Sequence, residues 1–312
     1  MAADMSSSSR RSSDGVGLAH LEPFATAFEL PLDDGGLCVA VTLPLYPCKD
    51  DDEYCPTLPL DELHAQECAA LDSMTPTRQV QFAGGRAAMR RALMSLGLDV
   101  TAPVLSLSSG APDLRGVGAL GSISHTRGLA TAIACPPQVA DADEEGRALQ
   151  PPAAASSHAG PDPLSSSAVG IDVERASRQL NPRMARRVLH ETERRSLGAR
   201  PCAAVPDAAT DLLLRCSLKE ALYKALHPLV RRTIRWHTVQ VEPMPDGSCE
   251  LKMAELEAAV GFGLSASARW QLQSGFFVTT AMASLQDGGG DASQSEAAEA
   301  APCEAAEAVP SM

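Results

Sequence analysis

The stretch AVGIDVE at residues 168–174 is a short apolar run that ends in two acids. Its length and β-branched content predict a buried strand over Ala168–Val173. Side chains two apart on a strand point to the same side, so Asp172 and Glu174 present two carboxylates together. Such a pair repels unless a proton or a cation separates the charges, and a hard cation such as Mg²⁺ leaves room for substrate phosphates. Taken alone, however, the pattern is more typical of a strand end with two solvated acids.

A second pattern, SLKEALYK at residues 217–224, lies in the strongest helical stretch, which we expect over Asp211–Leu226 with Asp211 at its start. At about 100° per residue, its apolar residues form one stripe of Leu214, Leu218, Ala221, Leu222 and Ala225. Glu220 and Lys224 lie roughly opposite that stripe. Alone, they indicate an ordinary ion pair on a solvated face. Beside the carboxylate pair, they supply a third acid and an ammonium group that neutralises phosphate.

Two further patterns come earlier in the chain. SISHT at residues 122–126 places small hydroxyl groups next to His125, which suits an oxygen-rich ligand, although a polar strand end with a hydrogen-bonded histidine is the commoner case. FAGGR at residues 82–86 combines glycines, which permit close approach, with Arg86. Arg86 and Arg78 together are able to clamp a phosphate. In isolation, these two arginines indicate solvated charges on a helix surface.

The expected elements fall into two blocks of similar length and order. Residues 19–135 are expected to hold a strand at Leu37–Leu43, a helix from Asp61 to about Leu71, a helix over Thr77–Leu96 and two short strands within Gly118–Ala134. Residues 168–285 add, besides the strand and helix above, a helix over Pro182–Leu197, a strand at Ile234–Val241 and a hairpin of Ala268–Leu272 with Phe276–Leu285. This order predicts an α+β fold of two structurally similar α/β halves, related by a pseudo-twofold axis, with the active site at their interface.

Three stretches are predicted to be disordered: the N-terminus at residues 1–18, a loop insertion at residues 136–167 and an acidic tail at residues 286–312. They are rich in Ser, Ala, Pro, Gly or acids and hold few large apolar side chains. Burial in such segments cannot offset the loss of chain entropy on folding. The catalytic body is therefore expected within residues 19–135 and 168–285.

Composition excludes several classes of protein. The net charge of −13 argues against an overall basic surface for nucleic acid, and no apolar run approaches the length of a membrane span. The nine cysteines are scattered without zinc-site spacing, which favours free thiols in a reducing compartment. The N-terminus lacks an apolar signal core, so we expect a cytoplasmic protein; its Ser and Arg content leaves an organelle transit peptide open. Phosphate-loop, dinucleotide-binding and nucleophile-elbow motifs are absent from the sequence.

Taken in order, the motifs resemble those of the 4′-phosphopantetheinyl transferases. Within that superfamily the chain is similar to the long, two-half class, which includes the enterobactin-synthetase-associated and surfactin-type enzymes. The resemblance covers roughly residues 37–285. It rests on F-x-x-G-R at 82–86, G-x-P followed by G-S-I-S-H within 110–125, G-I-D-V-E at 170–174 and S-L-K-E-A-L-Y-K at 217–224.

The resemblance implies a transfer of the phosphopantetheine arm of coenzyme A to a carrier-protein serine, with release of 3′,5′-ADP. By similarity, Mg²⁺ on the pyrophosphate is held by Asp172, Glu174 and Glu220. Glu220 also acts as general base, directly or through water, and Lys224 lies against the pyrophosphate. The residues implied to bind coenzyme A phosphates are Arg78, Arg86, Ser124 and His125, with Lys219 a weaker candidate.

The implied partners are acyl or peptidyl carrier protein domains of fatty-acid, polyketide or peptide synthases. We expect a monomer that binds neither nucleic acid nor membrane. A different class of function is a non-catalytic module that binds coenzyme A or a carrier protein with the same fold. The presence of Asp172, Glu174, Glu220 and Lys224 favours the enzyme.

Overall fold

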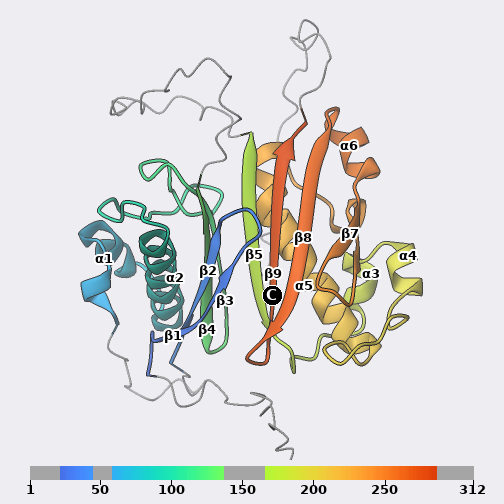
Figure 1. Ribbon diagram of the computed structural model, residues 1–312, viewed down its shortest axis with the longest axis horizontal. Helices are drawn as coiled ribbons and strands as arrows, with labels where there is room; N and C mark the ends of the chain where they lie inside the picture. Colours follow the sequence, from blue (N-terminus) through green and yellow to red (C-terminus); the bar gives the residue numbers. More distant parts are fainter. Residues whose placement is uncertain (1–21, 45–57, 137–165, 287–312) are drawn as a thin grey trace, which may run out of the picture.

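A computed structural model of the chain describes residues 22–44, 58–136 and 166–286. These residues form a mixed α+β fold, in which two antiparallel sheets pack together and each carries a long helix on its outer face (Figure 1). In Figure 1, α2 (Pro76–Ser95) lies at the left, followed to the right by the first sheet and then the second sheet, and α5 (Ala208–Val230) passes behind the strands of the second sheet. The predicted α+β class is confirmed.

The first sheet has the strand order β1-β2-β4-β3, with β1 at Thr26–Pro31, β2 at Leu37–Thr42, β4 at Leu129–Cys135 and β3 at Leu120–Thr126. The second has the order β5-β9-β8, with β5 at Ser167–Arg175, β9 at Phe276–Leu285 and β8 at Leu264–Gln273. β3 and β5 are thus edge strands. The two strands lie against each other, and the backbone amide of Ile171 on β5 donates to Ser122 Oγ on β3 at 3.3 Å.

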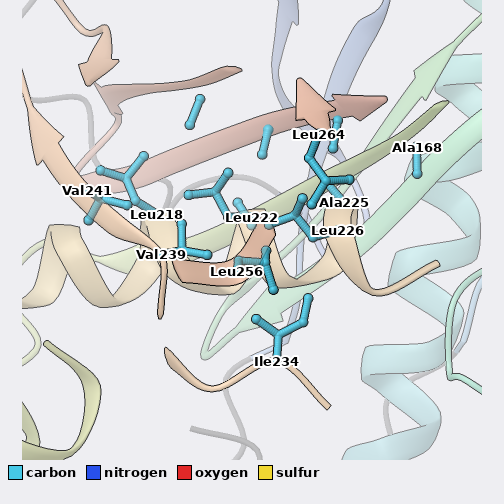
Figure 2. Packing of buried hydrophobic residues seen from close by; sticks show 14 of the residues in the cluster. Ala168, Leu218, Leu222, Ala225, Leu226, Ile234, Val239, Val241, Leu256 and Leu264 are labelled. Carbon is cyan, nitrogen blue, oxygen red and sulfur yellow. The ribbon is translucent and has the colours of Figure 1, made fainter. Parts of the chain in front are cut away.

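Buried side chains of β5 point alternately to the two faces of its sheet, which explains why the sheet is covered on both faces. On β5, Val169, Ile171 and Val173 point between the sheets, where they share one apolar cluster with residues of β1, β2, β4 and β9. Ala168 points to the other side and belongs to the cluster beneath α5 (Figure 2). The polar side chains at positions 172 and 174 share that second face, towards α5.

Several predicted elements are confirmed to within a few residues. β2 and α2 correspond to the predicted strand Leu37–Leu43 and helix Thr77–Leu96. The predicted hairpin is the pair β8 and β9, which is joined at Ser274 and Gly275 with φ of 51° and 81°. Two successive residues with positive φ are typical of a tight turn that matches the twist of antiparallel strands.

Two predicted helices differ from the structure for the same reason, which is that a histidine caps a helix at a position that was not predicted. Asp61 lies in a 3₁₀ turn at Leu60–Glu62, and α1 (Ala65–Leu71) begins after His64, whose Nδ1 accepts from the Gln66 amide at 3.1 Å. The single helix predicted over Pro182–Leu197 is two short helices, α3 (Met184–Val188) and α4 (Glu191–Arg195). The break arises because His190 caps α4 as His64 caps α1.

The ends of two other predicted elements also differ. α5 begins earlier than expected because Asp207 accepts from the Thr210 amide at 2.8 Å and caps the helix, whereas Asp211 is buried inside it. The strand predicted at Ile234–Val241 is mostly a loop with a 3₁₀ turn at Trp236–Thr238, and only its end belongs to β6 (Gln240–Pro243). The elements that were not predicted are β1, β7 (Cys249–Lys252) and α6 (Ala254–Val260).

The two blocks repeat one buried clamp. Glu67 accepts from the His64 amide, pairs with Arg90 of α2 at 2.8 Å and accepts from the Val104 amide. In the second block Glu193 accepts from the His190 amide at 2.7 Å. It also pairs with Lys219 of α5 at 2.9 Å and accepts from the Val241 amide at 2.9 Å. The two blocks therefore share a structural device, while the pseudo-twofold axis stays a prediction.

The stretches predicted to be disordered lie outside the described residues, apart from residues 136, 166, 167 and 286. Ser167 already belongs to β5, so the predicted loop insertion ends before it. Within the described ranges, no helix has the length and apolar content needed to cross a membrane.

Candidate active site

The site begins where β5 and α5 touch at Gly170. A Cβ atom at this position would lie 1.9 Å from the Ala221 carbonyl oxygen and 2.8 Å from the Ala225 amide nitrogen. Only glycine fits such an approach of strand and helix backbones. The contact lays the helix face that carries Ser217 and Lys224 over the acidic end of β5.

Asp172 is held by three side chains from two elements, β3 and α5. Its Oδ1 accepts from Ser124 Oγ of β3 at 2.7 Å and from Lys224 Nζ at 3.2 Å. Its Oδ2 accepts from Ser217 Oγ at 2.8 Å. Lys224 Nζ also donates to the Ile171 carbonyl at 2.8 Å. The structure therefore brings together three of the predicted site residues from both blocks, namely Ser124, Asp172 and Lys224.

Glu174 lies two residues further along β5, on the same face. Its Oε1 forms an ion pair with Arg178. Its Oε2 is buried and has no hydrogen-bond partner in the described part of the chain. Burial raises the pKa of Glu174, and the charge of Asp172 raises it further, while Arg178 opposes both. A buried carboxylate oxygen without a partner is costly, and a bound cation would satisfy it.

Glu220 completes the acidic group from α5. Burial raises the pKa of Glu220 to about 7, the charges of Asp172 and Glu174 act in the same direction, and Lys224 opposes them. The three acids therefore lie in one electrostatic environment. A carboxylate whose pKa lies near neutral pH is suited to accept a proton during a reaction.

Over residues 22–44, 58–136 and 166–286, no three His, Cys, Asp or Glu side chains are arranged to hold a metal ion as they stand. The chemistry of Asp172, Glu174 and Glu220 nevertheless fits Mg²⁺, because two of the three acids have raised pKa values and Glu174 Oε2 is unpartnered. The assignment of these acids as ligands stays a prediction.

Arg78 of α2 and His125 of β3 meet beside this group. Arg78 Nη1 lies 2.7 Å from His125 Nε2. An arginine only donates, so His125 Nε2 accepts and the ring proton is on Nδ1. Burial lowers the pKa of His125 to about 4, and the charges of Arg78 and Lys224 lower it as well. His125 is therefore neutral at neutral pH, and Arg78 carries the positive charge of the pair.

The contact between α2 and β3 depends on the glycines of the FAGGR motif. A Cβ atom on Gly85 would lie 2.7 Å from a methyl carbon of Ile123, so the helix approaches the strand closely at this point. Ile123 and His125 are two residues apart and share one face of β3. The close packing therefore explains how Arg78 of the helix reaches His125 of the strand.

Two predicted phosphate-binding residues lie elsewhere. Arg86 is buried and donates to the Val104 carbonyl and Ser106 Oγ, both at 2.8 Å. Lys219 is also buried and donates to Glu193 and to the Trp236 carbonyl, both at 2.9 Å. Both side chains therefore brace the fold in this structure, and the structure does not bring them to the acids.

A cleft of about 600 Å³ is lined at one end by Glu220 and Lys224. Its walls come from both blocks: β3 with the preceding loop at 107–119, the start of β5, and the part of α5 that carries Glu220, Tyr223 and Lys224. Tyr223 is fixed by stacking, with its ring centroid 5.2 Å from that of His227 and 5.7 Å from that of Trp236. The cleft offers a largely apolar wall next to a charged end.

Three residues around the acids were not predicted to act there. Ser217 could have been found, because it precedes Glu220 by three residues and Lys224 by seven and so shares their helix face. Thr279 lies opposite Asp172 in the β5–β9 register, which the sequence does not reveal. Arg178 follows Glu174 by four residues, after the strand has ended, where helical spacing gives no guide.

Two family profiles match the chain. One, described as the 4′-phosphopantetheinyl transferase superfamily, matches residues 168–280. The other, described as the 4′-phosphopantetheinyl transferase N-terminal domain, matches residues 66–135. Together they cover both blocks and every predicted site residue. A comparison with curated proteins gave no match.

Solved structures of acyl carrier protein synthases are distant matches. The apo form from Chronobacterium ammoniagenes is 17% identical, with a TM-score of 0.29, and the match covers 38% of this chain and 97% of that one. Its coenzyme A complex has 17% identity, a TM-score of 0.30 and coverages of 38% and 98%. The Mycobacterium tuberculosis enzyme has 18% identity, a TM-score of 0.27 and coverages of 38% and 96%.

The two profiles agree with the order of the motifs along the chain, from the N-terminal arginines to the acids of β5 and α5. The protein is a member of the 4′-phosphopantetheinyl transferase superfamily.

Proposed function

We propose that the chain transfers the 4′-phosphopantetheine arm of coenzyme A to a serine of an acyl or peptidyl carrier protein. The observation that carries the proposal is the grouping of Asp172, Glu174 and Glu220 beside Lys224, in which Glu220 and Lys224 line a cleft whose walls come from both blocks. Phosphoryl-type transfer depends on neutralising charge and aligning groups more than on covalent help from the protein. Acids for a cation, a positive ammonium group and an adjoining cleft meet those needs.

In the proposed reaction the serine oxygen forms a bond to the β-phosphorus of coenzyme A. The bond from that phosphorus to the bridging oxygen breaks, and 3′,5′-ADP leaves. Glu220 accepts the serine proton, directly or through water, since its pKa of about 7 lets it be ionised at slightly alkaline pH. Lys224 stabilises the negative charge that builds on the departing oxygen.

Asp172, Glu174 and Glu220 would hold the magnesium ion. When bound, Mg²⁺ offsets the charge on the pyrophosphate oxygens. Arg78, with neutral His125 beside it, would bind a further phosphate of coenzyme A. Arg86 and Lys219 take no direct part, because their charged groups bond inside the fold.

Two other functions remain to be separated by experiment. A non-catalytic module of the same fold would bind coenzyme A or a carrier protein and transfer nothing. A Mg²⁺-dependent phosphohydrolase that used the same acids would release phosphopantetheine without a carrier. The two-half class, the monomeric state and the cytoplasmic location stay predictions from the sequence.

The test uses the purified chain with an apo carrier protein, coenzyme A and Mg²⁺, and the carrier is weighed by mass spectrometry. A gain of one phosphopantetheine group that disappears with a chelator supports the transferase. A control without carrier detects hydrolysis, since only a phosphohydrolase releases phosphopantetheine there. Binding of coenzyme A with no mass gain on any carrier would instead support the non-catalytic module.

A further inference from the structure

We propose that Ser217, supported by Thr279, is a positioning residue that fixes the carboxylate of Asp172 for cation binding. The inference rests on the proposed function, since it assigns a role within the same site. Asp172 is surrounded by hydroxyl groups. Neither the motif of three acids nor the cleft explains why these hydroxyl groups are there. Ser217 and Thr279 are 1% and 0% exposed, so neither hydroxyl group is able to contact a substrate directly.

The direction of the hydrogen bonds follows from the chemistry of the groups. An ionised carboxylate only accepts, so the single proton of Ser217 is donated to Asp172 Oδ2 at 2.8 Å. Thr279 Oγ1 lies 2.9 Å from Ser217 Oγ. Because the Ser217 proton is already used, Thr279 is the only possible donor here, and its single proton is shared between Ser217 Oγ and the Ser217 carbonyl oxygen at 3.0 Å. The two hydroxyl groups therefore form a chain that ends on the carboxylate.

The chain is anchored at both ends in regular structure. Thr279 lies on β9, directly opposite Asp172 in the strand register. Its hydroxyl also lies 3.0 Å from the carbonyl oxygen of Ser217, so α5 is tied to β9 at this position.

The opposite oxygen of Asp172 is held from the first block. Ser124 of β3 donates to Oδ1 at 2.7 Å, and Lys224 donates to the same atom at 3.2 Å. With Ser217 on Oδ2, the carboxylate is restrained from both sides and cannot rotate without losing a charge-assisted bond. Removal of Ser217 frees one side while leaving Asp172, Glu174 and Glu220 in the chain. Groups that orient metal ligands in this way typically change metal affinity or activity by about tenfold to a hundredfold.

The experiment measures Mn²⁺ binding to the full chain by electron paramagnetic resonance, with coenzyme A present and no carrier. The variants are Ser217→Ala, Thr279→Val and Thr279→Ser. Thr42→Val is the matched control, because Thr42 is likewise buried in the neighbouring sheet and donates to the Glu22 carbonyl at 2.6 Å. Thermal unfolding of each variant records whether the fold is kept.

We expect Ser217→Ala to raise the Mn²⁺ dissociation constant about tenfold or more, and Thr279→Val to raise it by a smaller factor. Thr279→Ser, which keeps the hydroxyl, and Thr42→Val should match the unaltered chain. If Ser217→Ala does not fold, the contrast between Thr279→Val and Thr279→Ser carries the test.

Two results would overturn the proposal, and they are distinguishable. If the unaltered chain binds Mn²⁺ and the folded Ser217→Ala and Thr279→Val variants bind it equally well, the positioning role is wrong and the proposed function stands. If the unaltered chain binds no Mn²⁺ and transfers no phosphopantetheine, the proposed function fails together with the inference.

Discussion

Gly170 and Ala221 are in backbone contact, since a methyl group on Gly170 would lie 1.9 Å from the Ala221 carbonyl oxygen. This contact sets the distance between β5 and α5. The same distance allows Lys224 and Ser217 of the helix to reach Asp172 of the strand. The glycine that begins the GIDVE motif therefore serves the site through packing, not through chemistry of its own.

Gly170→Ala should lower the free energy of unfolding by about 3 kcal/mol or more, because the clash is with helix backbone that cannot move aside alone. Chemical denaturation measures the change. Gly116→Ala is a matched control, since a Cβ atom there would lie 3.8 Å from the nearest side chain. Equal stability of the two variants would show that α5 does not pack on β5 this closely.

Glu220→Gln should change how stability depends on pH in metal-free protein. The folded chain keeps the Glu220 proton up to a pKa of about 7, whereas the ordinary value is 4.5. The unfolded state therefore binds fewer protons across this interval, and the stability of the unaltered chain falls as the pH rises through it. Glu220→Gln lacks this loss. Its stability relative to the unaltered chain should therefore rise between pH 4.5 and about pH 7 and stay constant at higher pH. The gain should not exceed about 3.5 kcal/mol, because the pKa rises from 4.5 to about 7 and one pKa unit corresponds to about 1.4 kcal/mol.

Urea denaturation at several pH values, with and without Mg²⁺, measures this effect. Added Mg²⁺ should restore the stability of the unaltered chain at alkaline pH and leave the variant nearly unchanged. A constant difference between the two proteins at all pH values would mean that Glu220 is not buried among like charges.

The two lysines of the SLKEALYK motif should respond differently to replacement by methionine. Lys219→Met leaves Glu193 buried without its cation, which should destabilise the fold by about 3–5 kcal/mol. Transfer per folded molecule, measured at low temperature, should be retained. Lys224→Met should keep most of the stability and slow transfer roughly tenfold to a hundredfold, which corresponds to one charge-assisted hydrogen bond. The reverse pattern would mean that Lys219 faces the substrate.

Arg78→Ala should weaken the binding of coenzyme A, because Arg78 is proposed to contact a phosphate other than the one that reacts. We expect the KM for coenzyme A to rise about tenfold or more, since a hydrogen bond to a charged group contributes about 1.5–3 kcal/mol. The KM for dephospho-coenzyme A, which lacks the 3′-phosphate, should change little when Arg78 is replaced by alanine. An equal rise for both donors would place Arg78 at the pyrophosphate instead.

Local patterns were sufficient to predict β5, α5 and the edge strand β3, because alternation and helical periodicity are short-range signals. The starts of α1 and α4 were missed because their cap residues are histidines. H-x-x-E at 64–67 and at 190–193 has the spacing of a capping box, with an imidazole nitrogen in place of a hydroxyl. That spacing, once recognised, would have divided the region of residues 182–197 into two helices.

The surroundings of buried charges could not be predicted in the same way. Lys219 lies in a motif shared with Glu220 and Lys224, yet its partner Glu193 lies 26 residues away on another helix. Arg86 similarly donates to the Val104 carbonyl, 18 residues away. Which charge turns inward depends on the packing of whole elements, so the sequence identified the motifs but not which of their cations face the cleft.

The most direct test of the central claim is the mass of an apo carrier protein after incubation with the chain, coenzyme A and Mg²⁺, across fatty-acid, polyketide and peptide carriers. The account predicts a gain of one phosphopantetheine group on at least one carrier, on its serine, and no gain with Asp172→Asn. Absence of any gain across the panel, or an undiminished gain with Asp172→Asn, would contradict it.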